Sequence, residues 1–172
     1  MGYSVVEPAS VIATHVGKII RDNLEELFGF DEVYALHQRL SAIAPKLSET
    51  LNTALTPMQQ LRTIRYLLKE QVPLLDIKTI ATSLLDSCEI TKDPILLSAD
   101  IRCALKRGII KQVAGDKNKL NIFTLDEKLE KTLMQALQQS QQQGKTPLDS
   151  FPIDPQLLSQ IQHKMPVIKE KM

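Results

Sequence analysis

Residues 10–33 read Ser-Val-Ile-Ala-Thr-His-Val-Gly-Lys-Ile-Ile-Arg-Asp-Asn-Leu-Glu-Glu-Leu-Phe-Gly-Phe-Asp-Glu-Val, and this stretch decides the fold class. Its apolar side chains recur at helical spacing and its charged side chains fall opposite them, which predicts an amphipathic helix with one buried face. Pro8 lies at the expected first turn, and Gly29 lies just past the expected end, where a left-handed turn is easiest. The expected buried face holds Ile12, Val16, Ile19, Ile20 and Leu27, and the polar face holds Lys18, Arg21, Asp22 and Glu25.

This first helix is predicted to cover about residues 9–28, and a second helix of about residues 31–44 follows it. Asp31 is the expected capping residue of the second helix, so the two form a helical hairpin. Asn23 falls near the middle of the apolar face, where an unpaired amide costs about 1–3 kcal/mol. We therefore expect Asn23 to bond with a backbone group, or the helix to turn slightly and expose it. His15 lies on the flank of this face and is expected at the edge of the core.

The composition favours an aliphatic core built from helices. Of 172 residues, 43% are hydrophobic and 4% are aromatic, and there is no Trp. The formal net charge of +1 provides no general attraction to nucleic acid or to an anionic membrane. Cys88 and Cys103 are too few for a disulfide framework and indicate thiols in a reducing compartment. No apolar run approaches the ~18–20 residues that span a bilayer.

Start signals mark three further helices. A capping hydroxyl precedes a proline at Thr56-Pro57, Asp76 is placed to cap the next helix, and Thr91-Lys-Asp-Pro94 repeats the cap-then-proline pattern. We predict helices over about residues 57–70, from residue 77, and from residue 94 to about 112, with a short helix at 47–55 before them. Their inward residues are expected to be Leu47, Leu51 and Leu55; Leu61, Ile64, Leu67 and Leu68; Ile77, Ile80, Leu84 and Leu85; and Leu97, Ile101 and Leu105.

Beyond this point the pattern changes from helix to strand. Leu120–Leu125 alternates well enough to predict a strand. Asp126 then caps another helix, and Asp154-Pro155 opens a last one. A linker over residues 145–152, which holds two prolines, separates these helices.

The stretch GYSVVEPASVIATH…IIRDNLEELFGFDEV, residues 2–33, resembles part of the large export-gate protein of type III secretion. Bacterial flagella and injectisomes share this family, and the resemblance lies in its cytoplasmic C-terminal region. Val11–His15 and the turn Glu26–Gly29 are more similar to the flagellar branch. The resemblance extends from residue 2 to about residue 130.

The segment Gln71-Val-Pro-Leu-Leu-Asp76 is also similar to the family. There the turn is commonly Gly-Val-Pro-Ile-Arg-Asp, followed by Leu-Arg-Thr-Ile. Gln71 and Leu75 depart from this pattern, and the loss of the arginine puts in doubt any charged contact that the family makes there. Thr91–Pro94, followed by Ile101–Leu105, is a further similar segment. The matching positions of the turn and the helix after it are Val72, Pro73, Asp76, Thr79 and Ile80.

The resemblance implies a mainly α protein with a helical subdomain over residues 1–109 and a small α/β subdomain over residues 110–172. In the family a strand–helix–strand unit completes the second subdomain, and we expect this chain to stop before it. The strand at 120–125 would then lack its usual neighbours, so this region is expected to be extended, swapped or paired with another copy. The opening Met1-Gly2-Tyr-Ser-Val-Val6 indicates an entry into the middle of a longer protein.

The resemblance also implies a function in protein export. The family's membrane part forms a channel, and its cytoplasmic part forms a ring that receives chaperone–substrate complexes at the cytoplasmic face of the bacterial inner membrane. Expected partners are other export-apparatus proteins, chaperone–substrate complexes and further copies in a homo-oligomeric ring. The membrane is expected to be reached only through a segment absent from this chain. Protein contacts are expected at the first hairpin and the turn, at Arg21, Glu25, Asp31, Glu32, Val72, Pro73 and Asp76.

No residue pattern indicates catalysis, a metal or a cofactor. His15, His37 and His163 have no companion at metal-ligand spacing, and no phosphate-cradling glycine loop occurs among six glycines. We therefore expect a protein that is not an enzyme and that uses no cofactor. The alternative is a winged-helix-like nucleic-acid-binding module that uses the basic segment Lys106–Lys119. The near-zero net charge and the lack of aromatic residues in this segment favour a protein that binds no nucleic acid.

Overall fold

The structure is a computed structural model that describes residues 7–115, 117, 119–120, 122, 124–142 and 153–170. It divides into two compact units, Met1–Gly115 and Asp116–Met172, and each unit is described by itself. The predicted organisation into subdomains at residues 1–109 and 110–172 stays a prediction.

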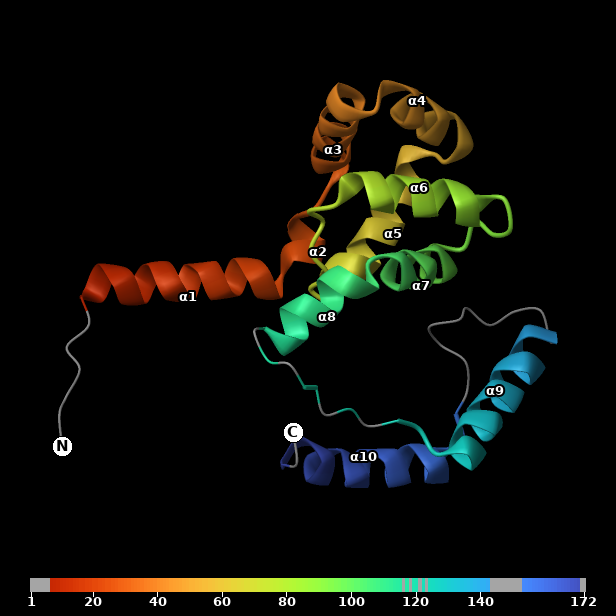
Figure 1. The fold of residues 1–172 in the computed structure, drawn as a ribbon. Coiled ribbons are helices and arrows are strands. Elements are labelled where there is room, and N and C mark those ends of the chain that lie inside the picture. Colours follow the sequence, from red (N-terminus) through yellow and green to blue (C-terminus); the bar gives the residue numbers. More distant parts are fainter. Residues whose placement is uncertain are drawn as a thin grey trace. The chain divides into compact units, whose positions relative to one another are not determined.

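All regular elements in the described residues are α-helices, so the predicted mainly α fold is confirmed (Figure 1). The first unit holds α1 (Pro8–Asp22), α2 (Leu24–Leu27), α3 (Phe30–Ile43), α4 (Pro45–Ala54), α5 (Pro57–Lys69), α6 (Ile77–Cys88), α7 (Pro94–Ala104) and α8 (Lys106–Ala114). The second unit holds α9 (Glu127–Gln142) and α10 (Pro155–Glu170).

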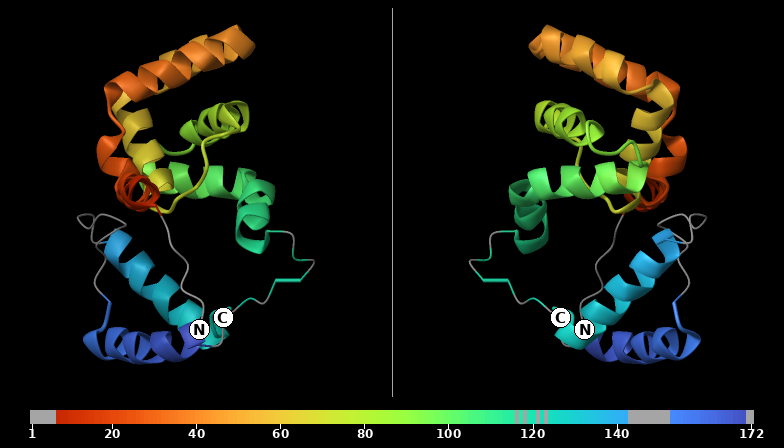
Figure 2. Two further views of the ribbon diagram at one scale, coloured as in Figure 1. Left: turned by 90° about the vertical axis from the view of Figure 1, so that its left-hand side faces the viewer. Right: turned by 90° about the vertical axis from the view of Figure 1, so that its right-hand side faces the viewer.

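The core of the first unit lies among α3 to α7. Helix α7 packs against α5 and α6, while α4 packs against α3 and α6. The two views of Figure 2 show that these helices, coloured orange to green, cross one another. The core is aliphatic, as the composition predicts, because the helices and the residues that join them supply leucine, isoleucine, valine and alanine. Its buried members are Leu40, Leu51, Leu55, Leu67, Val72, Ile80, Ala81, Leu84, Leu97, Ile101 and Leu105.

Local side-chain bonds set the starts of α5, α6 and α7 where the sequence predicts them. The prediction that Asp31 caps the second helix is wrong, because the N-cap of α3 is Gly29 and Asp31 lies in its first turn. Thr56 Oγ1 accepts from the Gln59 backbone N–H at 3.3 Å, and the Gln59 Oε1 accepts from the Thr56 backbone N–H at 2.9 Å. This reciprocal pair satisfies two N–H groups that the helix itself leaves unpaired. Asp93 Oδ1 accepts from the Ile95 backbone N–H at 2.8 Å, directly before Pro94 begins α7.

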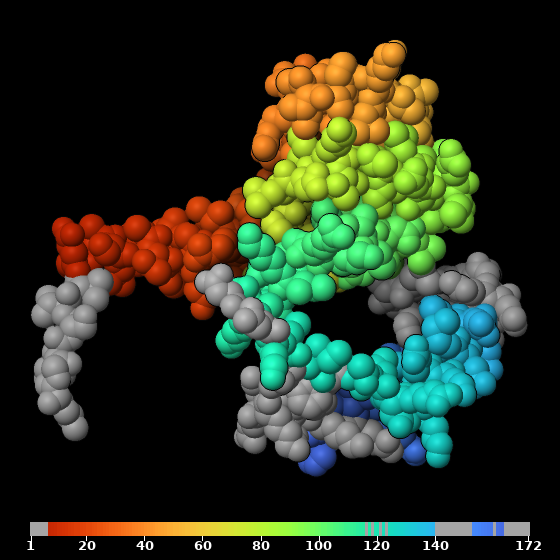
Figure 3. All heavy atoms as spheres, in the orientation of Figure 1, coloured from red at the N-terminus to blue at the C-terminus, as the bar shows by residue number. Residues whose placement is uncertain are grey.

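The prediction of a buried face on the first helix is wrong. No residue of α1 is buried, and Ile12 and Ile19 keep 64% and 49% of their surface exposed. Within the described residues, the element that α1 contacts appreciably is its neighbour α2, and Figure 3 shows α1, in red, extending away from the first unit's body. His15 is exposed with the rest of this helix rather than set at a core edge. Helical periodicity predicts which face of a helix is apolar. It does not predict whether another element packs on that face, and no described element buries the apolar face of α1.

The first helix also ends earlier than predicted, because Asn23 interrupts it. The backbone of Asn23 leaves the helical region at φ −126° and ψ 25°, and α2 begins at the next residue. The Asn23 Nδ2 donates to the Ile19 carbonyl oxygen at 2.7 Å and the residue is also exposed, so both predicted alternatives, a backbone partner and exposure, are found. A side-chain amide that bonds to the backbone competes with the helical ladder, and this competition accounts for the early end.

A second interruption divides the helix predicted from residue 94 to about residue 112. Leu105 lies between α7 and α8 with φ −83° and ψ 6°. It is 8% exposed and belongs to the core, and the half-buried Ile109 packs against that core. The change of direction at Leu105 keeps both side chains against the core, which accounts for two helices in place of one.

The predicted strand is not found among the described residues of its segment. Leu120, Ile122, Thr124 and Leu125 carry no strand, while positions 121 and 123 lie outside the described residues. A single strand without a neighbour has no backbone hydrogen-bond ladder and is not stable by itself. The predicted linker at residues 145–152 lies outside the described residues.

Candidate protein-contact surfaces

The first candidate surface is the hairpin formed by the end of α1, α2 and the start of α3. Arg21 lies exposed in the last turn of α1, and Glu25 is half-buried in α2. Asp31 and Glu32 are exposed in the first turn of α3. The Glu32 Oε2 accepts from the Gly29 backbone N–H at 2.7 Å, so this carboxylate also stabilises the start of its helix.

The second candidate surface is the turn that joins α5 to α6. Gln71 has a positive φ of 56°, and its backbone N–H donates to the Leu68 carbonyl at 2.8 Å. The Val72 N–H donates to the Leu67 carbonyl at 2.9 Å, which completes a Schellman end to α5. This geometry turns the Val72 side chain into the core, where it is 6% exposed. Leu75, at 85% exposed, presents its side chain to solvent.

Asp76 ends the turn and caps α6, as the sequence predicts. Its Oδ1 accepts from the Thr79 backbone N–H at 3.0 Å, and its Oδ2 accepts from the Thr79 hydroxyl at 2.7 Å. The bond from the Thr79 hydroxyl has the larger effect and the bond from the Thr79 backbone N–H the smaller one. Together they hold the pKa of the Asp76 carboxyl below its ordinary value of 3.8. The turn therefore ends on a fixed negative charge.

A hollow of about 490 Å³ lies between this turn and α8. The Gln112 Nε2 donates to the Gln71 carbonyl oxygen at 3.2 Å and joins α8 to the turn. Leu75 lines this hollow and gives it an exposed apolar side chain. The lining residues are Pro73, Leu75, Asp76, Leu105, Gly108, Ile109, Lys111 and Gln112.

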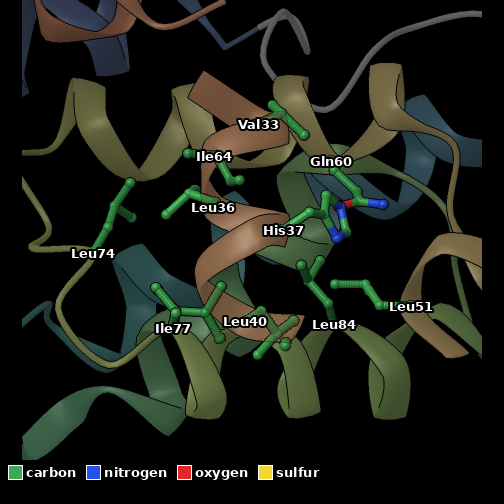
Figure 4. Close-up of a pocket in the computed structure, with 12 residues that line it drawn as sticks. Val33, Leu36, His37, Leu40, Leu51, Gln60, Ile64, Leu74, Ile77 and Leu84 are labelled. Atoms are coloured by element: carbon green, nitrogen blue, oxygen red, sulfur yellow. The ribbon is translucent and has the colours of Figure 1, made fainter. Parts of the chain in front are cut away.

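A polar pair lies in the apolar pocket between α3, α5 and α6 (Figure 4). Gln60 is 2% exposed, and its Nε2 donates to the Leu55 carbonyl oxygen at 2.9 Å. The Gln60 Oε1 lies 2.6 Å from the His37 Nε2, so this nitrogen of His37 carries the hydrogen and donates. The pocket has a volume of about 30 Å³, which is the space of about one water molecule. We therefore interpret the pair as part of the packing rather than as a ligand site.

The described residues contain no cluster of three or more His, Cys, Asp or Glu side chains that could hold a metal. Cys88 is half-buried and Cys103 is exposed, and both are free thiols. The basic segment at residues 106–119 begins with exposed side chains on α8, and its described residues form no strand that could serve as a wing. None of the described helices is both long enough and apolar enough to cross a membrane.

The described residues thus form a mainly α protein with candidate surfaces on a hairpin and a turn. The chain belongs to the FHIPEP family, which it matches over residues 1–172. It is 49% identical over 172 residues to the putative flagellar export/assembly protein LfhA of Escherichia coli O44:H18 (strain 042 / EAEC). That alignment covers 100% of this chain and 24% of the relative. The flagellar biosynthesis protein FlhA of Escherichia coli K12 is 38% identical over 138 residues, which cover 80% of this chain and 20% of that protein.

Solved structures show the same fold. A structure of the Chlamydia pneumoniae CdsV and CdsO complex matches with a TM-score of 0.83 at 22% identity, over 94% of this chain and 46% of that chain. The nonameric SctV-C of EPEC matches with a TM-score of 0.77 at 21% identity, over 94% of this chain and 47% of that chain. The predicted resemblance to the C-terminal region of the type III export gate, and to its flagellar branch, is therefore confirmed. The chain spans about a quarter or less of these curated relatives.

Proposed function

We propose that this chain serves protein export by binding other proteins on the cytoplasmic side of a flagellar-type export gate at the bacterial inner membrane. In this proposal it catalyses no reaction. The single observation that carries this proposal is the match to the family over residues 1–172. The neighbour SctV-C is nonameric, and CdsV was solved with CdsO, so copies of the chain and another export-apparatus protein are the first partners to test. Chaperone–substrate complexes are the third kind of partner to test.

The geometry favours two contact surfaces for this function. The hairpin offers charged side chains of both signs at Arg21, Glu25 and Asp31. The turn offers Pro73 and the exposed Leu75 beside the hollow, with the charged Asp76 at its end. Val72 contributes by holding the turn in the core. Contact residues that are held in place before binding favour assembly, and the Asp76 cap and the buried Val72 hold the turn in this way.

The test uses a full-length flagellar export gate that carries this region, in cells that lack their own copy. One variant combines Arg21→Glu, Glu25→Lys and Asp31→Lys, and a second carries Leu75→Asp. Each is expected to reduce export of substrate proteins into the medium and the yield of assembled rings, because it reverses charge or places a carboxylate at a contact. Arg39→Glu, on the exposed side of α3, is the matched control. Normal export and normal ring assembly by both variants would exclude these surfaces.

A further inference from the structure

A hollow of about 430 Å³ on α5 gathers three cationic side chains. Arg62, Arg65 and Lys69 follow one another at helical spacing and therefore share one exposed face of the helix. The row from residue 62 to residue 69 is about 10 Å long at the rise of an α-helix. The other lining residues are Tyr66 of α5, Glu25 of α2 and Pro94 of α7.

The charges of this row are available for a partner. In the part of the chain that the structure describes, ion pairs join Arg102 to Glu70 and Lys131 to Glu127, so neither Arg62 nor Lys69 is in one. The Arg65 Nε donates to the Phe28 carbonyl oxygen at 2.9 Å, which leaves its terminal nitrogens to bind elsewhere. This bond also fixes the guanidinium group at the hollow before any partner arrives.

The arrangement is unfavourable for the isolated helix. Like charges three and four residues apart on a helix repel each other, and the row contains two such pairs. A surface that only keeps a helix in solution mixes both signs, whereas Glu25 is the one carboxylate in the lining. A negatively charged occupant would remove this repulsion.

We propose that this hollow binds an acidic, extended segment of a partner protein. Two or three carboxylates spread over about 10 Å, which is about three residues of an extended chain, match the row of cations. Arginine binds carboxylates with paired, charge-assisted hydrogen bonds, and the ring of Pro94 offers apolar contact to a side chain between them. The hollow is separate from the turn at residues 72–76 and shares only Glu25 with the hairpin surface, and a cationic row that binds an acidic segment goes beyond the proposed function.

A peptide fits this hollow better than a nucleic acid does. Three cations neutralise only a few phosphates, and non-specific nucleic-acid binding depends on the number of phosphates neutralised. Glu25 lies in the lining and would repel a continuous phosphate chain. The net charge of the whole chain is only +1, which adds little attraction from a distance.

The test measures the fluorescence anisotropy of a labelled peptide in which glutamate alternates with alanine around a central leucine. A second peptide has glutamine in place of glutamate, and a single-stranded DNA of similar length is the third probe. The protein variants are Arg62→Glu with Lys69→Glu, and Arg62→Ala with Lys69→Ala. Arg39→Glu with Lys46→Glu is the matched control, because it changes the net charge equally at exposed positions of α3 and α4. Thermal melting checks that every variant folds.

The wild-type protein is expected to bind the glutamate peptide, and more weakly as salt is raised. The double charge reversal on α5 is expected to weaken binding by at least about tenfold and the double alanine variant by a smaller factor, while the matched control binds as wild type does. The proposal would be overturned if the matched control lost as much affinity as the charge reversal on α5, or if the glutamine peptide bound as tightly as the glutamate peptide. Tighter binding of the DNA than of the glutamate peptide, or no binding of that peptide at all, would also overturn it.

Discussion

Gln71 has a positive φ, and among the described residues it is the only residue other than glycine that does. A left-handed conformation costs a residue with a Cβ about 1–2 kcal/mol, and glycine avoids this cost but loses more chain entropy on folding. We expect Gln71→Gly to raise the free energy of unfolding by about 0.5–1 kcal/mol. Urea unfolding measures the change. Gln71→Ala is the control, and an equal gain in both variants would contradict this explanation.

The Asp76 carboxyl makes the stability of the folded protein depend on pH. Its pKa is lower in the folded protein than its ordinary value of 3.8, because the carboxylate accepts two bonds from Thr79. The stabilisation is therefore present above that ordinary value and is lost as the pH falls through the lower folded pKa. Asp76→Asn is expected to lower Tm at neutral pH, because an amide nitrogen cannot accept the Thr79 hydroxyl, and to flatten the acid end of a plot of Tm against pH. An acid limb of undiminished slope would contradict it.

At the scale of elements, α1 is an amphipathic helix, and the described residues bury none of its side chains. Because Ile19 keeps 49% of its surface exposed, Ile19→Lys is expected to change the free energy of unfolding by no more than about 0.5 kcal/mol. Urea unfolding of the purified chain tests this at several protein concentrations. A loss of about 2 kcal/mol or more would mean that the face is covered in solution.

Elements differ in how well the sequence alone predicts them. The starts of α5 and α7 are predictable because a capping residue is followed by a proline, and the start of α6 is predictable from the Asp76 cap alone. The pair of His37 and Gln60 was not predictable, because it joins residues 23 apart in the sequence. The row of cations on α5 was not predicted as a site from the sequence, because the packing of α2 and α7 beside the row is what makes the hollow.

At the scale of the whole molecule, stability depends on α7 and the helices around it. Leu97 has 0% of its surface exposed and lies in the core, so Leu97→Ala is expected to lower the free energy of unfolding by about 2–5 kcal/mol. Leu96, on the same helix but 40% exposed, is the matched control, and Leu96→Ala is expected to cost far less. Comparable losses at the two positions, measured by urea unfolding, would show that α7 is packed differently.

The interruption at Asn23 has a consequence for proteolysis. Helix α1 can unwind without disturbing the buried leucines, because none of its side chains belongs to the core. Local opening of this kind sets the rate at which a protease cuts a native protein. Trypsin is therefore expected to cleave after Lys18 and Arg21 early in a limited digest and to leave a resistant product that begins near Asp22 and retains α3 to α7.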